Sequence, residues 1–237
     1  MKYFIVLPCA GHGRRFGAKK QFIKLFNKEI FLYTLDEIRK IGILDKVILT
    51  FPKENIIRAK QILENYYKNN NFLEKIDLIL GGKERQESVY LALKYIYEKY
   101  KPSKRDIVSI HDCVRPLVKK EYFVKSYELL FRKNIDGVIL GAKPKDTVKE
   151  IKGNFVKKTL NRENLILTQT PQTFFFKDIY EAHLEAQKEN VFVTDDSSLL
   201  ERKGKKIFIL KGDYKNIKIT TLEDLYIMRV FLNASSN

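Results

Sequence analysis

Residues 3–17 read YFIVLPCAGHGRRFG, an apolar run that passes directly into a loop of glycines and arginines. The run has the length and composition of a buried strand, and open α/β sheets bind ligands at the carboxyl ends of their strands. Glycines let backbone amides approach a phosphate closely, and arginines add charge-assisted hydrogen bonds to its oxygens. We therefore expect the backbone around Gly11 and Gly13 to cradle a nucleotide triphosphate.

Two familiar phosphate-binding motifs do not fit this loop. The dinucleotide fingerprint G-x-G-x-x-G requires a closer third glycine than Gly17 provides, and the Gly-Lys-Ser/Thr ending of a Walker A loop is missing. Two adjacent arginines also suit a triphosphate better than the pyrophosphate of a dinucleotide. A nicotinamide-dependent reductase is therefore disfavoured, and a solvated surface turn is the structural alternative.

Outward from this loop, apolar runs alternate with amphipathic stretches. The expected strands are Tyr3 to Leu7, Lys46 to Thr50, Ile76 to Leu80, Ile107 to His111, Gly137 to Ala142 and Ile207 to Leu210. The expected helices are Phe31 to Ile41, Lys53 to Lys68, Glu87 to Tyr100, Lys120 to Lys133, Lys177 to Lys188 and Thr194 to Lys203, with a further helix after Thr220. Strands rich in Ile, Val and Leu with helical spacers predict an α/β fold, a Rossmann-like, doubly wound, mostly parallel sheet.

Residues 143–172 interrupt this alternation. Val148 to Ile151 and Phe155 to Leu160 read as two short strands around a turn at Lys152-Gly153-Asn154. An isolated hairpin is marginal in water, so we expect this inserted β-hairpin arm to pack on something else, such as a second subunit. The whole chain, 1–237, is interpreted as a single domain that includes this arm.

The composition limits the class of protein. The 45 Lys and Arg residues outnumber 29 acids and give a formal charge of +16, which fits a nucleic-acid binder, polyanionic small substrates or a composition without specific meaning. The basic residues are spread along the chain, so nucleic acid is not the expected partner. No run approaches the roughly 20 apolar residues of a membrane span, and the N-terminus lacks the pattern of a secretory signal, so a soluble cytoplasmic protein is expected.

Seven blocks of sequence together resemble the signature of the 2-C-methyl-D-erythritol 4-phosphate cytidylyltransferases. They keep the order of that family and span nearly the whole chain. The blocks are Pro8-x-Ala10-Gly11-x-Gly13-Arg14-Arg15 with Lys20-Gln21, Gly81-Gly82-x-x-Arg85-x-x-Ser88-Val89, His111-Asp112-x-x-Arg115-Pro116, Lys145-Asp146-Thr147-Val148-Lys149, Thr170-Pro171-Gln172-x-Phe174, Thr194-Asp195-Asp196-x-Ser198 and Asn216-Ile217-Lys218-Ile219-Thr220. The resemblance implies a cytidylyltransferase of non-mevalonate isoprenoid synthesis, which joins CTP to a sugar-alcohol phosphate and releases pyrophosphate.

The resemblance also assigns cations to the reacting phosphates. It places Arg15, Lys20 and Lys218 around the triphosphate, where negative charge grows on the phosphorus and on the leaving group. Without it, Lys20 and Lys218 would read as ordinary surface lysines. No general base is needed, because a phosphate monoester with a second pKa of about 6 is already largely dianionic at neutral pH. Accordingly, His111 is interpreted as structural, and His183 as lying on a helix surface.

The nucleotide itself is assigned to two loops. In the family, positions matching Gly81, Gly82 and Ser88, with the backbone near Ala10, recognise cytosine. Glycines at a strand end let backbone atoms reach the edge of a base. The alternative for these residues is a simple turn with a serine at the start of a helix.

The alcohol phosphate is assigned to a third set. The resemblance places Asp112, Arg115 and Thr194 on the methylerythritol phosphate side, with Thr147 and Arg162 delivered by the arm of a second subunit, so it implies a homodimer. It also implies Mg²⁺ on the triphosphate, for which Asp112 is the nearest carboxylate. A structural Asp–Arg pair and solvated arm charges are the alternatives.

Two points remain open. Ribitol-5-phosphate cytidylyltransferase resembles the same scaffold, although the arm sequence and Asn161-Arg162 look more like the methylerythritol enzyme. Cys9 and Cys113 stand where small alanine-like residues are usual in the family. They read either as small buried hydrophobes or as thiols close to the nucleotide.

Overall fold

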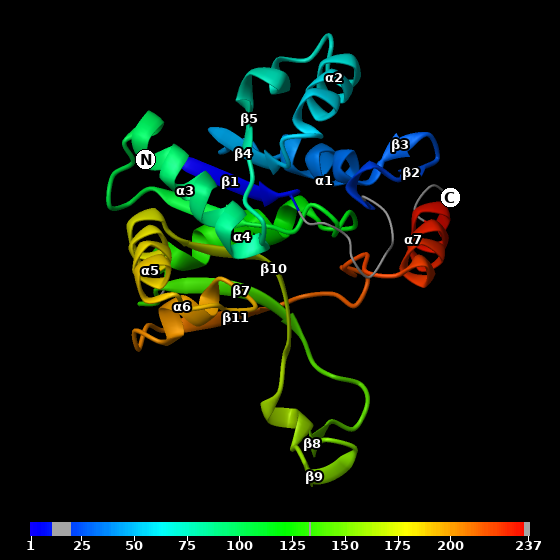
Figure 1. The fold of residues 1–237 in the computed structure, drawn as a ribbon, viewed down its shortest axis with the longest axis vertical. Coiled ribbons are helices and arrows are strands. Elements are labelled where there is room, and N and C mark those ends of the chain that lie inside the picture. Colours follow the sequence, from blue (N-terminus) through cyan, green and yellow to red (C-terminus); the bar gives the residue numbers. More distant parts are fainter. Residues whose placement is uncertain (11–19, 133, 235–237) are drawn as a thin grey trace.

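The computed structural model of the chain describes residues 1–10, 20–132 and 134–234 (Figure 1). A seven-stranded sheet forms its centre, in the order β11-β7-β10-β6-β1-β4-β5. β10 is antiparallel to both β6 and β7, and the other six strands run in one direction. The strands are β1 (Tyr3–Pro8), β4 (Lys46–Phe51), β5 (Ile76–Leu80), β6 (Ile107–Ile110), β7 (Gly137–Ala142), β10 (Leu167–Phe175) and β11 (Ile207–Lys211). The predicted α/β, mostly parallel fold is confirmed.

The side chains of β1 alternate between the two faces of the sheet. Tyr3, Ile5 and Leu7 enter a core with α1 (Ile30–Arg39), α2 (Ile56–Tyr66) and α4 (Lys120–Arg132). Phe4 and Val6 enter a second core with α3 (Arg85–Tyr100), α5 (Phe176–Glu189) and α6 (Ser197–Glu201). Because both faces are covered, the strand reads as a continuous apolar run.

β10 is not among the strands that the sequence predicts. The sequence predicts an arm up to residue 172, but Leu167–Phe175 is the return path from the arm and inserts between β6 and β7. Its register shifts between Gln169 and Gln172, around Pro171. Proline cannot donate to a ladder and is found at such irregularities, so a proline-containing polar run argued against a central strand.

The arm projects from the body of the molecule (Figure 1). It carries the predicted hairpin, β8 (Lys149–Lys152) and β9 (Phe155–Thr159), with Gly153 at a φ of +58° in the turn, followed by the short helix η3 (Arg162–Asn164). The remaining short elements are η1 (Lys20–Phe22), β2 (Lys24–Leu25), β3 (Lys28–Glu29) and η2 (Asn71–Lys75).

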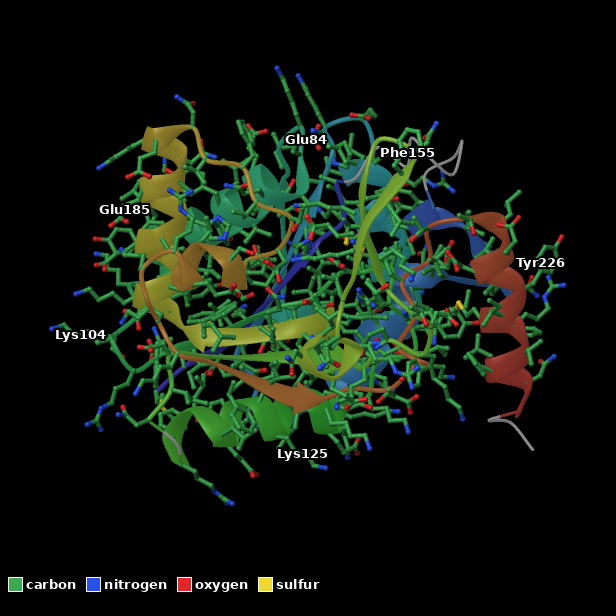
Figure 2. The ribbon with its side chains drawn as sticks, turned by 90° about the horizontal axis from the view of Figure 1, so that it is seen from below. Glu84, Lys104, Lys125, Phe155, Glu185 and Tyr226 are labelled. Atoms are coloured by element: carbon green, nitrogen blue, oxygen red, sulfur yellow. The ribbon has the colours of Figure 1, made fainter. Side chains whose placement is uncertain are left out.

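The last described element is α7 (Leu222–Ala234), which packs on the first core through Met228. Charged side chains, among them Lys104, Lys125 and Glu185, surround the outside of the molecule, while Phe155 on the arm and Tyr226 on α7 are large exposed side chains (Figure 2). In the described part of the chain, no helix has the length and apolar character to cross a bilayer.

Candidate active site

The ends of β1, β4 and β5 bring the predicted cytosine-binding residues together. Ala10 is buried, and a Cβ added at Gly81 would stand 2.4 Å from the Ala10 Cβ. Only glycine therefore permits this close approach of the two chain segments. The Ser88 hydroxyl accepts a hydrogen bond from the Gly82 amide at 3.1 Å and donates to the Glu84 carbonyl at 3.0 Å. The serine thus holds the turn from Gly81 to Glu84 in shape.

Most of the predicted phosphate loop lies outside the described residues. This applies to Gly11, Gly13 and Arg15, and to the side chain of Lys20, whose backbone begins η1. The described flanks of the loop are fixed: the buried Gln21 donates from Nε2 to the Cys9 carbonyl at 3.0 Å, and Phe22 packs against Phe51 with ring centroids 5.5 Å apart. The segment that carries Lys20 is therefore anchored to the end of β1.

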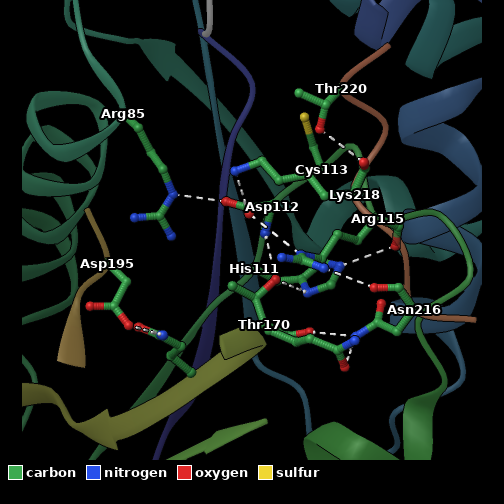
Figure 3. A network of polar contacts seen from close by, with 12 residues as sticks. Arg85, His111, Asp112, Cys113, Arg115, Thr170, Asp195, Asn216, Lys218 and Thr220 are labelled. Carbon is green, nitrogen blue, oxygen red and sulfur yellow. Dashed lines mark hydrogen bonds and ion pairs between the residues drawn. The ribbon is translucent and has the colours of Figure 1, made fainter. Parts of the chain in front are cut away.

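Asp112, directly after β6, is the centre of a cluster of cations (Figure 3). Its Oδ1 accepts from Arg85 Nε at 2.8 Å, and its Oδ2 lies 2.9 Å from Lys218 Nζ and 3.6 Å from Arg115 Nε. Burial alone raises the pKa of Asp112, but the charges of Arg85, Lys218 and Arg115 together hold that pKa well below its usual range. Three cations around one carboxylate leave an excess of positive charge, which suits phosphate ligands.

A loop near the C-terminus carries Lys218 into this cluster. Arg115 donates from Nη1 to the Asn216 carbonyl at 2.8 Å, and Asn216 donates from Nδ2 to the Thr170 carbonyl at 2.9 Å. The Ile219 amide donates to the Val114 carbonyl at 2.9 Å. The loop is thereby fixed to the segment after β6 and to β10, so the position of Lys218 depends on long-range contacts.

A cavity of about 750 Å³ opens beside Asp112. Besides the three cations, its walls include the exposed Thr194, the carboxylate of Asp195 and apolar side chains of β7 and β11 such as Ile139 and Ile207. Its size and its mixture of apolar walls with a few convergent polar groups are typical of small-molecule sites. Asp112, Arg115 and Thr194, predicted for the alcohol phosphate, line this one cavity together with Lys218, predicted for the triphosphate.

Comparison with known proteins identifies the family. The family model of IspD, 2-C-methyl-D-erythritol 4-phosphate cytidylyltransferase, matches residues 3–234. The chain belongs to this family. Its relatives include the 2-C-methyl-D-erythritol 4-phosphate cytidylyltransferases of Clostridium beijerinckii, at 41% identity over 96% of both chains, and Fusobacterium nucleatum, at 38% identity over 96% of both chains.

Solved structures agree with this assignment. The 4-diphosphocytidyl-2C-methyl-D-erythritol synthase of Anaerococcus prevotii superposes with a TM-score of 0.82 at 30% identity, covering 98% of this chain and 96% of that one. The 2-C-methyl-D-erythritol 4-phosphate cytidylyltransferase of Francisella tularensis gives a TM-score of 0.79 at 31% identity, covering 97% and 99%. The resemblance stated from the sequence motifs is confirmed.

In this cytidylyltransferase-family chain, the arm residues lie apart from the cavity. Thr147 is exposed and Arg162 is exposed, and the Arg162 guanidinium donates from Nη1 to the Lys145 carbonyl within the arm at 2.8 Å. Neither side chain lines the cavity. The structure therefore does not bring these two predicted residues to the other predicted substrate residues.

The two histidines in the described part of the chain have structural positions. His111 is buried, with Nδ1 2.9 Å from the Thr170 hydroxyl and Nε2 3.3 Å from the Arg115 carbonyl. Burial, the largest cause, lowers the pKa of His111 to about 3, so the ring is neutral at physiological pH. The prediction that His183 lies on a helix surface is wrong: it is fully buried, with Nε2 3.2 Å from Asp196 Oδ1.

The two cysteines are free and buried. Cys9 and Cys113 are 1% and 2% exposed and belong to the first apolar core. Burial raises the pKa of the Cys9 thiol well above its usual value, and the neighbouring Cys113 and Asp112 raise it further. A buried thiol is inaccessible to reagents and packs as a small apolar side chain, so both residues act here as small buried side chains.

Three polar residues of the site were not assigned from the sequence. Arg85 donates from Nη2 to Asp196 Oδ2 at 2.7 Å, and Gln172 Oε1 accepts from the amides of Asp196 and Ser197 at 3.0 and 3.1 Å. The three residues are Arg85, Gln172 and Asp196. All of them lie in the sequence blocks that resemble the family, and this membership is the signal that could have identified them. Their partners are distant in sequence, so the pairing became visible only in the folded chain.

Proposed function

We propose that the chain transfers the cytidylyl group of CTP to 2-C-methyl-D-erythritol 4-phosphate, giving 4-diphosphocytidyl-2-C-methyl-D-erythritol and pyrophosphate. The observation that carries this proposal is the cluster of cations around Asp112. The cluster is joined through Arg85 to the turn after Gly81, and the chain belongs to the cytidylyltransferase family. The reported relatives are named for the methylerythritol substrate, and none of them supports the ribitol phosphate alternative. The reaction belongs to the non-mevalonate route of isoprenoid synthesis.

The chemistry follows from the charges of the site. An oxygen of the alcohol phosphate attacks the α-phosphorus of CTP, the new P–O bond forms, and the bond to the β-phosphate bridging oxygen breaks. Negative charge grows on the five-coordinate phosphorus and on pyrophosphate, and cations fixed in advance stabilise this state more than the ground state. Lys218 supplies one such cation, and Arg15 and Lys20 are expected to supply the others. No side chain has to remove a proton, which agrees with the engagement of both His111 nitrogens.

The two substrates occupy neighbouring parts of the site in this proposal. Cytosine lies against the backbone of Ala10, Gly81 and Gly82, where the chain segments approach most closely. The alcohol phosphate lies in the cavity, where Arg115 and Thr194 face it. Positioning the two reactants in one fixed geometry then supplies much of the rate.

Magnesium belongs with the nucleotide rather than with a protein site in this proposal. In residues 1–10, 20–132 and 134–234, no three His, Cys, Asp or Glu side chains group together in a way that could hold a metal. Both carboxylate oxygens of Asp112 already face cations, so this residue does not fit the predicted role of metal ligand. Mg²⁺ readily keeps most of its waters and binds substrate phosphates, so it would enter as the Mg²⁺ complex of CTP.

The functional unit we propose is a homodimer joined through the arm. At the tip of the arm, Ile151, Phe155 and Val156 are 65%, 81% and 62% exposed. A two-stranded hairpin with such a surface gains stability only when another surface covers it. A second copy would cover the tip and receive Thr147 and Arg162 beside its cavity.

A pyrophosphate-release assay tests the proposed function. The protein is supplied with CTP and Mg²⁺ and either 2-C-methyl-D-erythritol 4-phosphate or ribitol 5-phosphate, and the nucleotide product is identified by mass. We expect release only with the methylerythritol substrate, and much less with ATP, GTP or UTP. Release that depends on ribitol 5-phosphate instead would replace the proposed acceptor.

Two further statements from the sequence stay predictions. These are that nucleic acid is not a partner of the protein and that the protein is cytoplasmic.

A further inference from the structure

Arg85 occupies the junction between the two parts of the site. It is the first residue of α3, directly after the Gly81 to Glu84 turn. Its Nε donates to Asp112 Oδ1 at 2.8 Å, and its Nη2 donates to Asp196 Oδ2 at 2.7 Å. These partners are 27 and 111 residues away in sequence, so a single side chain links three distant segments; Figure 3 shows the contact with Asp112.

We propose that Arg85 is a positioning residue for cytidylyl transfer, which holds the nucleotide turn, Asp112 and the Thr194–Asp196 segment in one reactive geometry. This inference rests on the proposed function and adds a residue to it. Arg85 acts through Asp112 and Asp196 rather than by supplying charge to the triphosphate, which is the role of Lys218.

The two carboxylates differ in how much they depend on Arg85. Asp112 also faces Lys218 and Arg115, so it keeps cationic partners without Arg85. Asp196 is 1% exposed, and the other side chain described at its carboxylate is His183 at 3.2 Å. Burial raises the pKa of Asp196, yet the net shift is downward because the Arg85 charge and the His183 hydrogen bond outweigh burial. Without Arg85, the buried carboxylate of Asp196 loses the guanidinium charge that compensates it.

The segment that Arg85 holds is also the one that presents Thr194 and Asp195 to the cavity. Gln86, the next residue of α3, donates to the Val191 carbonyl at 2.9 Å and accepts from the Val193 amide at 2.9 Å. Gln172 holds the opposite side, donating to Asp195 Oδ2 at 2.8 Å. The start of α3 therefore sets the place of this segment, and the guanidinium is the charged part of that attachment.

Lysine cannot reproduce this link. A guanidinium presents donors in a planar fork that can contact two carboxylates at once, whereas an ammonium is a compact charge at the end of a flexible chain. Arg85→Lys keeps the charge and most of the volume but loses one of the two contacts. Arg85→Lys therefore separates the effect of losing a contact from the effect of losing the positive charge.

The test compares Arg85→Lys, Arg85→Ala, Asp196→Asn and the double variant Arg85→Ala/Asp196→Asn in the pyrophosphate-release assay. Arg202→Ala is the matched control, because Arg202 pairs with Glu189 at 3.4 Å on the exposed surface. We expect kcat to fall about 100-fold in Arg85→Ala and Arg85→Lys, as misplacement of reacting groups by about 1 Å can cause, with a small change in KM for CTP. The double variant should be no slower than Arg85→Ala alone, since both changes break one link.

Chemical rescue separates positioning from a purely structural role. Millimolar ethylguanidinium should restore part of the kcat of Arg85→Ala and leave Arg202→Ala unchanged, with unfolding temperatures measured in parallel. Arg85→Lys with wild-type kcat in a folded protein, or multiplicative losses in the double variant, would overturn the proposal. Either of these two results can be seen only if the wild-type enzyme is active. If the proposed function is wrong, the wild type itself releases no pyrophosphate, so the two failures can be told apart.

Discussion

Lys218 Nζ lies 2.9 Å from Asp112 Oδ2, which joins a loop near the C-terminus to the segment directly after β6. The lysine is 40% exposed while the aspartate is 8% exposed, so the ammonium stands at the boundary between a buried carboxylate and the cavity. Arg85 and Arg115 already neutralise the same carboxylate. Asp112 therefore positions the Lys218 ammonium, but Lys218 is not the only cation that compensates the charge of Asp112.

Lys218→Ala should lower kcat by roughly 100- to 1000-fold, the loss that follows removal of one fixed charge-stabilising group. The fold should remain intact, because Asp112 keeps Arg85 and Arg115. Steady-state pyrophosphate release and thermal unfolding measure the two effects. Lys94→Ala is the control, since Lys94 lies on the surface of α3 and pairs with Glu98 at 3.8 Å. Turnover of Lys218→Ala close to that of the control would remove Lys218 from the catalytic residues.

Gly81→Ala should weaken CTP binding specifically. The added Cβ would meet the Ala10 Cβ at 2.4 Å, so the end of β1 and the turn after β5 must separate. Overpacking of this kind costs about 1–3 kcal/mol, and we expect KM for CTP to rise at least about tenfold while KM for the alcohol phosphate changes little. Gly42→Ala is the matched control, because a Cβ there meets nothing within 4 Å. Equal kinetics for the two variants would contradict the assignment of Gly81 to the nucleotide.

Mixing two inactive variants should restore activity if the sites are shared. Arg162→Ala damages the arm, and Lys218→Ala damages the cavity. In a heterodimer, one site combines both lesions and the other combines neither, so random exchange of subunits should give about a quarter of wild-type activity. Co-expression followed by pyrophosphate assay and light scattering measures this. A mixture no more active than its separate components, or a monomeric mass, would contradict the proposed dimer.

His111→Asn should flatten the decline of stability in mild acid. The folded chain holds the pKa of His111 at about 3, chiefly through burial, whereas an unfolded chain has a value of about 6.5. The unfolded state therefore binds the proton first, and stability falls as the pH decreases below 6.5. From pH 7.5 to 5.0 this residue should cost the wild type about 2 kcal/mol, measurable as free energies of unfolding in urea at those two pH values. An equal decline in both proteins would show that His111 is not the titrating group.

The sequence alone determined the class of fold and predicted which edge of the sheet binds the ligand. Short apolar runs such as Tyr3 to Leu7, bounded by turn residues and separated by amphipathic stretches, indicate buried strands, and glycines directly after a strand predict phosphate-binding backbone at its carboxyl end. These features are local: they depend on the periodicity and conformational freedom of neighbouring residues. The motif resemblance then supplied residue roles that composition could not, for Lys218 above all.

Only the tertiary structure decided which side chains act together. Leu167–Phe175 becomes a central strand despite Pro171, because the returning chain has to fill the space between β6 and β7. His183 lies on the buried face of α5 with Ile179 and Ala186, and its polar partner there, Asp196, comes from thirteen residues further along the chain. The role proposed for Arg85 depends on its contacts with Asp112 and Asp196, which separate connections of the sheet bring to it. Pairings of this kind are set by the packing of whole elements, so no local pattern in the sequence encodes them.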